Sequence, residues 1–572
     1  MFISLFHIAG LVLISTAVCF GVGRAIKGSN DVFFMNQFWI GWGVLLVVSQ
    51  IFNLFIAVNW VISYSFIFLA IWGLSRIQYK CLCRDFFIKN WIYFVLCSLF
   101  LIWLSNRALS PNLNEDSGLY HLGVVNWIRE FAVVPGVGNL HARLAFNNSS
   151  LFFPAVIDSL GFNIPSLRFS NSVLIFALFC DYLFLVKKYK NDTSPRAGFI
   201  VSYSLITFSL IFYLSFAAIG LDTDVPVMIL GLVLIRKFVI YLTYPEKDFR
   251  LLSFIFLCSI GFTLKLSFGV FCFLMALIVL ITSIMRGELE FCSKKLIWVL
   301  LIPIVVIGPF IARGYIMSGY PFFPSTFGSI SVDWKIPEEE AELHTYAIRS
   351  FARDSSYEYI KNAEDMEKWE WFIPWLTNHF KEVKEIWIIT MPLNFSFFAI
   401  VFGWACNRKS LFNLRRLLLY IPFVAVFIFW LIAPSPRFAG SLFWYFCIIS
   451  SIPMIEVVTD RYSNLLRRAF IYIVLVVTVC LVGGYFIKPE SVWTKSSEYM
   501  KHFPLPKTPY NIHFLSNSIG LYTPKSSDCL SWDLPLPSGP ALPVYLELRD
   551  VTNLGYGFRD RRTMADEPSL RE

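Results

Sequence analysis

Charged residues are scarce in this chain. They make up 15% of its 572 residues, whereas hydrophobic residues make up 57%. A soluble globular domain has about 25% charged residues, and a larger core does not account for a difference of this size. The scarcity excludes an ordinary soluble protein. Together with long apolar runs, it predicts an all-α polytopic membrane protein.

Motifs for nucleotides and metals are missing. The sequence has no Walker A loop and no GxGxxG loop, so we do not expect an ATP-driven transporter. Cys81 and Cys83 lack the spacing and the second ligand pair of a zinc site. The net charge is +9, and its basic residues follow membrane topology. We therefore expect no metal, no cofactor and no nucleic-acid partner.

No Lys or Arg precedes the first apolar run, MFISLFHIAG. This absence argues against a cleaved signal peptide and for a first span whose N-terminus lies outside. Apolar runs of about 20 residues predict the membrane spans. We predict fourteen: 2–23, 37–57, 59–75, 90–106, 168–186, 197–217, 224–243, 251–264, 267–285, 296–312, 386–405, 417–433, 439–457 and 469–487. The short segment 251–264 suggests a broken helix, with Lys265 at a hairpin.

Basic residues gather on one side of these spans. The odd-numbered connections carry them, for example Arg24 and Lys27 in the first and Lys187 and Lys188 in the fifth. The positive-inside rule then places the odd loops in the cytoplasm. Both termini are predicted to lie in the periplasm, outside a bacterial inner membrane.

The predicted spans divide the chain into three parts. Residues 1–89 form N-terminal transmembrane helices, and residues 90–487 form a transmembrane core. This core has two large outer loops, 107–167 and 313–385. Residues 488–572 form a Pro-rich outer tail, which we expect to be a small appendage.

The first outer loop holds its polar chemistry in residues 114–146. Glu115 and Asp116 open a predicted amphipathic helix over 119–131, which we expect to lie at the membrane interface. In one interpretation Asp116 or Glu115 is a catalytic base or orients an acceptor. In the other, Asp116 or Ser117 is simply the helix N-cap, because these side chains accept the free amide bonds of a first turn. The two roles are compatible.

Further polar residues on the outer side are candidate ligands for an acceptor or a sugar. They are His121, Arg129, His141, Arg143, Asp222 and Asp224. His121 and Arg129 fall off the apolar stripe of the predicted helix, and such a histidine is more often a surface residue. Asp222 and Asp224 also fit a capped turn, in which Asp224 begins a helix before Pro226.

Three cations are candidate ligands for a donor phosphate. Lys265 interrupts an apolar run, and an ionisable residue at membrane depth is a functional hypothesis because its burial is costly. Arg313 and Arg437 flank Pro/Gly turns at span ends, and arginine suits bidentate phosphate recognition. The alternative is that these residues snorkel or anchor at the membrane interface.

These features resemble the GT-C superfamily of polytopic glycosyltransferases, which use polyprenyl-phosphate-linked sugars. The matching segments are NEDSGLYHLGVVNWIREF at 114–131, RGYIMSGYPFFP at 313–324 and PSPRF at 434–438. In that superfamily, an acidic residue of the first large outer loop acts as a base or orients the acceptor. The chain is also similar to a group of bacterial membrane proteins met among surface-polysaccharide genes. It departs from the superfamily in having extra spans before the loop and Glu-Asp in place of Asp-x-Asp.

The resemblance implies a glycosyltransferase with a polyprenyl-phosphate-linked donor and a lipid-linked or cell-surface glycan acceptor, acting at the periplasmic face of the bilayer. Asp116 or Glu115 would deprotonate the acceptor, while Lys265, Arg313 and Arg437 neutralise the leaving phosphate. Two alternatives stay open. One is an O-antigen or capsule polymerase or ligase that uses lipid-pyrophosphate oligosaccharides. The other is a transporter or flippase of lipid-linked sugars.

Overall fold

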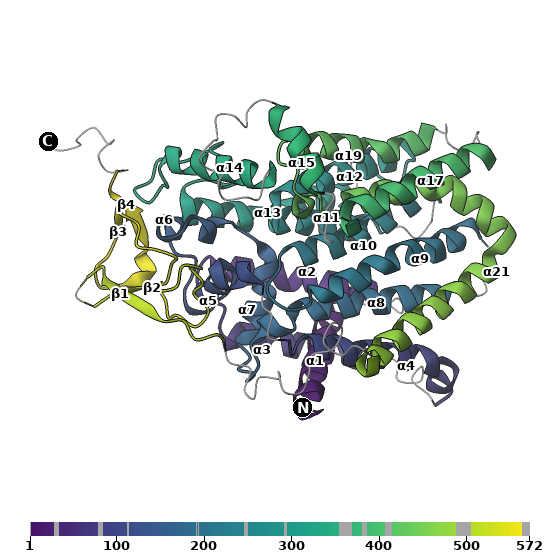
Figure 1. Ribbon diagram of the computed structural model, residues 1–572, viewed down its shortest axis with the longest axis horizontal. Coiled ribbons are helices and arrows are strands. Elements are labelled where there is room, and N and C mark those ends of the chain that lie inside the picture. The colour runs from purple at the N-terminus through teal and green to yellow at the C-terminus, as the bar shows by residue number, and fades with distance from the viewer. Residues whose placement is uncertain are drawn as a thin grey trace.

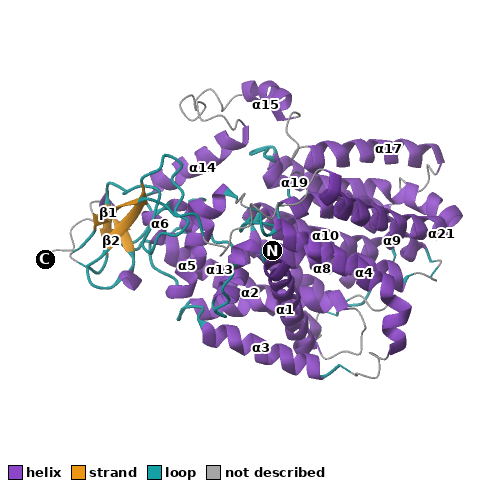
Figure 2. Ribbon diagram, turned by 60° about the horizontal axis from the view of Figure 1, so that its bottom comes forward, coloured by secondary structure: helices purple, strands orange, loops and turns teal. Residues whose placement is uncertain are grey.

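The computed structural model is mostly helical, with a few short strands near its C-terminal end (Figures 1 and 2). Cys81 and Cys83 lie outside the residues that it describes. The described residues are 2–27, 34–77, 84–110, 114–189, 192, 194–244, 250–290, 294–353, 369–379, 386–406, 414–487, 505–516 and 518–562.

Long apolar helices form a bundle. Among the described residues, 9 helical segments are long and apolar enough to cross a membrane, which makes the chain a multi-pass membrane protein. The bundle consists of α1 (Phe2–Lys27), α2 (Phe34–Asn53), α3 (Trp60–Ser75), α4 (Arg84–Arg107), α8 (Ser170–Lys188), α9 (Pro195–Phe216), α10 (Asp224–Thr243), α11 (Leu251–Leu264), α12 (Leu266–Met285), α13 (Lys294–Ser318), α17 (Met391–Cys406), α19 (Leu414–Trp430) and α21 (Leu442–Ile487).

Two of these helices test the predicted span boundaries. The predicted break at Lys265 is confirmed: α11 ends at Leu264, Lys265 is extended, and α12 begins at Leu266 and folds back on α11. The predicted connection between spans 439–457 and 469–487 is wrong, because α21 continues through it as one helix. Residues 458–468 contain no Pro or Gly that would end a helix.

Small residues bring the first helices into close contact. A Cβ added at Gly23 of α1 would lie 1.8 Å from the Gln37 carbonyl oxygen of α2. One added at Gly41 of α2 would lie 1.8 Å from the Cys19 carbonyl oxygen of α1. Backbones therefore touch here without intervening side chains, which is a common way to pack helices in a membrane.

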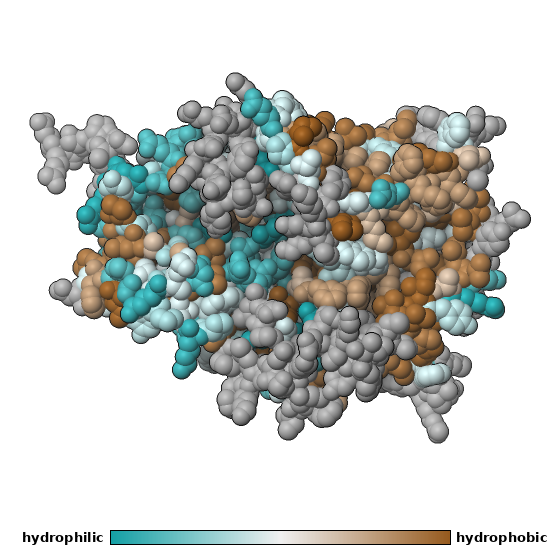
Figure 3. Space-filling model, viewed as in Figure 1, coloured by the Kyte–Doolittle hydropathy of each residue, from teal (hydrophilic) through white to brown (hydrophobic). Residues whose placement is uncertain are grey.

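Short elements cover one end of the bundle, which we call the polar end. Hydrophilic side chains gather there, whereas hydrophobic ones cover the opposite end around α17, α19 and α21 (Figure 3). The short elements are η2 (Ser117–His121), α5 (Leu122–Glu130), α6 (Val137–Leu140), η3 (Ala142–Ala145), η4 (Ser149–Leu151), α7 (Phe152–Asp158), η5 (Ser166–Arg168), α14 (Glu338–Arg353), η8 (Trp369–Trp371), α15 (Phe372–His379), η9 (Ile386–Thr390) and α20 (Pro436–Ala439).

The C-terminal tail packs against this end. Its elements are two antiparallel pairs, β1 (Tyr510–Phe514) with β2 (Gly520–Pro524) and β3 (Leu546–Leu548) with β4 (Phe558–Asp560), and the turn η10 (Leu554–Tyr556). The Phe558 N–H donates to the Pro135 carbonyl at 3.0 Å. Ion pairs join Arg549 to Asp333 (2.8 Å) and Arg562 to Glu340 (3.0 Å). The described tail is thus docked on both large loops.

Candidate functional site

Asp116 stands at the start of the helical segment that carries the first loop's polar residues. Asn114 caps this start, because its Oδ1 accepts the Asp116 N–H at 2.9 Å. The Asp116 side chain makes no capping bond, and Ser117 Oγ instead accepts the Leu221 N–H at 2.8 Å. Asp116 therefore stands at the predicted N-cap position, but the predicted capping bond from its side chain or from that of Ser117 is wrong. Capping by Asn114 leaves the Asp116 carboxylate available for other partners.

Arg437 binds that carboxylate from the far end of the sequence. It lies in the turn α20 of the PSPRF segment, and its Nη2 is 2.6 Å from Asp116 Oδ2. Its Nε is 2.9 Å from Oδ2 of Asp224, the first residue of α10. The planar fork of one guanidinium thus bridges two carboxylates, a geometry that a lysine cannot reproduce.

Lys265 completes the binding of Asp224. Its Nζ lies 2.5 Å from Asp224 Oδ1 and 3.3 Å from the carbonyl oxygen of Arg437. The same ammonium lies 4.8 Å from the centre of the Phe438 ring, within the range of a cation–π interaction. The sharp turn between α11 and α12 is what brings this lysine to the polar end.

Arg143 approaches Asp116 from the solvent side. Its Nη1 is 3.7 Å from Asp116 Oδ1, and its guanidinium lies 5.6 Å from the centre of the Tyr120 ring. The Arg143 side chain is 42% exposed, whereas that of Asp224 is 12% exposed. We call the set Asp116, Arg143, Asp224, Lys265 and Arg437 the acid–base network. It is open to solvent on one side and buried on the other.

The network makes Asp116 a weak base. Burial raises the pKa of Asp116, but the charge of Arg437 and its hydrogen bond lower it more, with help from His121 and Arg143. The net result is a pKa below the ordinary value of an aspartate. Asp116 is therefore better suited to orient a group than to take its proton.

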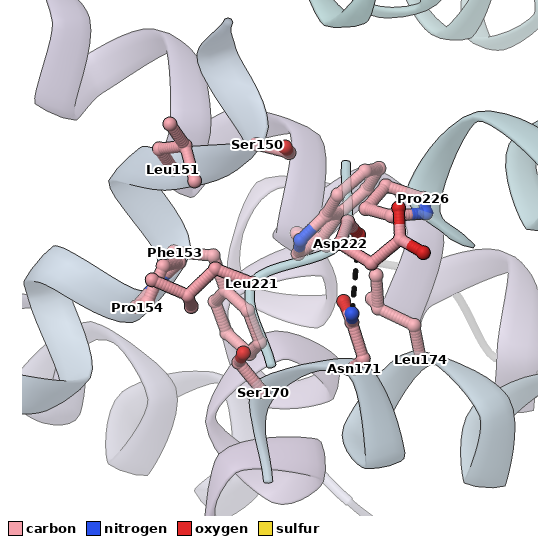
Figure 4. A pocket seen from close by; sticks show the side chains of 11 residues that line it. Ser150, Leu151, Phe153, Pro154, Ser170, Asn171, Leu174, Leu221, Asp222 and Pro226 are labelled. Atoms are coloured by element: carbon pink, nitrogen blue, oxygen red, sulfur yellow. Dashed lines mark hydrogen bonds between the residues drawn. The ribbon is translucent and has the colours of Figure 1, made fainter. Parts of the chain in front are cut away.

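Asp222 lies beside the network without an ion pair among the described residues. Its Oδ1 accepts the Asp224 N–H at 2.9 Å, and its carbonyl accepts from Asn171 Nδ2 at 3.1 Å (Figure 4). The expected capped turn is thus present. Burial raises the pKa of Asp222 to about 6, Asp224 adds to the effect, and Arg437 opposes it.

His121 is buried, so the prediction of a surface histidine is wrong. Its residue is 1% exposed, and neither ring nitrogen has a hydrogen-bond partner in the part of the chain that the structure describes. Burial lowers the pKa of His121 to about 4, although Asp116 opposes this effect. The imidazole is therefore neutral at pH 7, next to the charged groups of the network.

The other predicted site residues lie elsewhere. Arg313 is 4% exposed and donates to Asn53 and, at 3.4 Å, to Asn147 Oδ1. Glu115 is exposed. None of the contacts found in the described residues joins these two, Arg129 or His141 to the network. Their predicted roles stay predictions.

The protonation state of His141 depends on its burial and on the nearby charge of Arg143. Burial lowers the pKa of His141 to about 3, and the positive charge of Arg143 adds to this. The imidazole is thus neutral at pH 7. It lies close enough to Arg143 to feel its charge, although no hydrogen bond is seen between them in the described residues.

The C-terminal tail covers part of the site, which the sequence did not predict. Trp532 is 7% exposed and covers Gly118, where an added Cβ would lie 2.4 Å from the indole. The Ser531 N–H also donates to the Gly118 carbonyl at 2.9 Å. Gly118 follows Asp116 by two positions, so the tail packs directly on the turn that carries the network. Trp532 stands just before the Pro-rich segment 534–543, and a large aromatic residue there is a signal that could have been noticed.

The comparison with family models decides the classification. The model of a domain of unknown function, DUF8201, matches residues 1–444, about three quarters of the chain. The chain belongs to this DUF8201 family. The match covers all five network residues and ends before most of α21 and the tail. No curated protein and no solved structure matches the chain.

Proposed function

We propose that this DUF8201 protein is a membrane glycosyltransferase. It would move a sugar from a polyprenyl-phosphate-linked donor to a lipid-linked or cell-surface glycan, at the periplasmic face of a bacterial inner membrane. The observation that carries the proposal is Arg437, which holds Asp116 and Asp224 together at the polar end of the bundle.

The charges support a phosphate leaving group. Three cations, Arg143, Lys265 and Arg437, face the two ion-paired carboxylates of Asp116 and Asp224. A phosphodiester carries one negative charge, which can pair with these cations. A polyprenyl phosphate would replace the carboxylates as the partner of these cations, since phosphate accepts the same charged hydrogen bonds. The cations would then stabilise the charge that develops as the sugar leaves.

The position supports a lipid-linked substrate. The network contains the first residue of α10, the turn between α11 and α12, and α20, so it lies where bundle helices begin and end. A polyprenyl tail can stay among apolar side chains while its phosphate reaches these cations. The short elements of the polar end and the tail then offer space for a polar acceptor.

The test is transfer in proteoliposomes. We would supply radiolabelled undecaprenyl-phosphate hexoses and, as acceptor source, a lipid extract from cells that lack the gene. Wild-type protein should consume one donor and label the extract. Asp116→Asn and Arg437→Lys should each transfer at least about 100-fold more slowly, because both remove the bridged geometry. Glu339→Gln, an exposed acid on α14, is the control.

The outcomes separate the rival functions. Full activity of Asp116→Asn, or no donor consumed by wild type, would contradict the proposal. Consumption of lipid-pyrophosphate oligosaccharides alone would identify a polymerase or ligase, for which the two arginines Arg143 and Arg437 would be the phosphate ligands. Passage of labelled lipid across the bilayer without a new bond would identify a transporter.

A further inference from the structure

Asp222 differs from the two carboxylates of the network. Asp116 is bound by Arg143 and Arg437, and Asp224 by Lys265 and Arg437. Asp222 accepts a backbone N–H and makes no ion pair in the described residues, although Arg437 and Lys265 are near enough for their charges to act on it. A carboxylate in an ion pair has little tendency to take a proton, whereas one that is largely removed from water and makes no ion pair takes it more readily.

A small cavity lies beside Asp222. It is lined by residues of α2, η4, α7, α8 and the turn before α10, and has room for about one water molecule. In Figure 4, Asp222 and Pro226 form one wall, and Leu151 and Pro154 stand on the other side. Asp222 is the titratable group among the residues that line it.

A second group in the cavity wall points to a ligand. Trp42 of α2 is 1% exposed, and its indole N–H has no hydrogen-bond partner among the described residues. A buried donor without a partner costs free energy, so an oxygen atom is expected to occupy such a place. Trp42 and Asp222 line the same small cavity, so a hydroxyl placed there would lie beside both residues.

We propose that Asp222 is the proton acceptor of the transfer reaction and that this cavity seats the acceptor hydroxyl. The inference rests on the proposed function and assigns the roles within it. Asp116 is then a positioning residue, which holds Arg437.

The acceptor hydroxyl gives its proton to the Asp222 carboxylate, and its oxygen forms a bond to the anomeric carbon of the sugar. The bond between that carbon and the phosphate oxygen breaks. The electron pair leaves with the polyprenyl phosphate, whose charge Lys265 and Arg437 neutralise. Asp222 later releases the proton to water.

A pH profile distinguishes the two aspartates. Asp222 must be ionised to take a proton, so kcat/KM should rise with pH through about 6, the pKa of Asp222. The charged or titratable groups that face Asp222 are Asp224, Lys265, Arg437 and Tyr213 of α9. If Asp116 were the base, the acid limb would lie below the ordinary aspartate value, because its pKa is lowered.

Substitutions of Asp222 provide a second test. Asp222→Asn keeps the oxygen that accepts the Asp224 N–H, so the turn should survive. Transfer to the hydroxyl acceptor should fall by about 10²–10⁴-fold, with partial recovery in Asp222→Glu. The matched control is Asp192→Asn. Asp192 accepts the Ser194 N–H at 2.8 Å in the same kind of turn, before α9.

Rescue by azide distinguishes the loss of a proton acceptor from the loss of local structure. It attacks the anomeric carbon without losing a proton, so it should restore donor consumption in Asp222→Asn and not in Arg437→Gln. We would use the undecaprenyl-phosphate hexose that wild type consumes. An unchanged rate in Asp222→Asn, an acid limb below pH 4 or no rescue by azide would overturn the inference and leave the proposed function standing. A wild-type protein that consumes no donor would overturn both.

Discussion

The acid–base network and a second, buried ion pair both join aspartates to basic side chains, but they differ in how much solvent reaches them. Asp181 of α8 and Arg236 of α10 lie 2.8 Å apart, with side chains 6% and 5% exposed. The network begins at Asp224 on the same helix, about 18 Å away by the helical rise. Its side chains are 12–42% exposed.

The difference lies in the balance of charges. In the part of the chain that the structure describes, Asp181 and Arg236 form an ion pair only with each other. The neighbouring Tyr182, Tyr203 and Thr207 hydrogen-bond to one another. We call this pair closed, because both of its side chains are shielded from solvent, and it joins α8 to α10. The network has more cations than ion-paired acids and faces solvent, so it can bind an added anion. A buried charge alone therefore does not indicate a functional site, and it is the solvent-facing arginines that distinguish the network from this pair.

Breaking the closed pair should have the largest effect on stability. Arg236→Met leaves Asp181 buried without its cation and should cost about 3–5 kcal/mol of unfolding free energy. The double variant with Asp181→Leu should recover most of the loss, since neither charge then remains. Thermal unfolding in detergent measures both. If the single variant is as stable as wild type, the pair is not structural.

Acid should destabilise the protein through His121. Its pKa is lowered from 6.5 to about 4 in the folded state, so the unfolded chain takes up a proton first. The contribution is present above pH 6.5 and is lost as pH falls to about 4, amounting to about 3 kcal/mol.

Melting curves between pH 4 and pH 7 check this expectation. His121→Gln should flatten the dependence of Tm on pH relative to wild type. Equal slopes in wild type and His121→Gln would show that His121 is not the group responsible.

Adding a side chain at Gly118, where the tail packs on the network, should lower stability moderately. The Cβ of Gly118→Ala would press on Trp532, and such overpacking costs about 1–3 kcal/mol. We expect faster hydrogen exchange in β1–β4 and in 114–130. Adding Trp532→Phe should relieve part of the strain. Exchange that changes in only one of these regions would show that they are not coupled.

Removing one acid of the network should have the smallest cost in stability. Asp224→Asn leaves Arg437 with Asp116 and Lys265 with Phe438, so we expect a loss of about 1–2 kcal/mol, less than for the closed pair. It also releases cationic charge and should tighten the binding of undecaprenyl phosphate, measured by tryptophan fluorescence. Weaker binding would mean that Asp224 does not compete with the phosphate.

Local patterns predicted most helices of the bundle. They also named all five network residues as site candidates, Asp116 as a catalytic residue and the other four as parts of donor or acceptor sites. The break at Lys265 followed from an apolar run too short to cross a bilayer. The partners of these residues could not be predicted, because Asp116 and Arg437 are 321 positions apart. The cap at Asn114 was missed because Asp116 and Ser117 are equally good caps in sequence.

The amino-acid sequence by itself determined that this is a multi-pass helical protein, because hydrophobic runs need no knowledge of their neighbours to favour a bilayer. It also determined which ionisable residues stand at the ends of those runs. Only the tertiary structure decided that Arg437 bridges Asp116 and Asp224, that Arg313 lies apart, and that Trp532 covers Gly118. Those contacts join distant segments, and their energies depend on packing and burial that the local sequence does not contain.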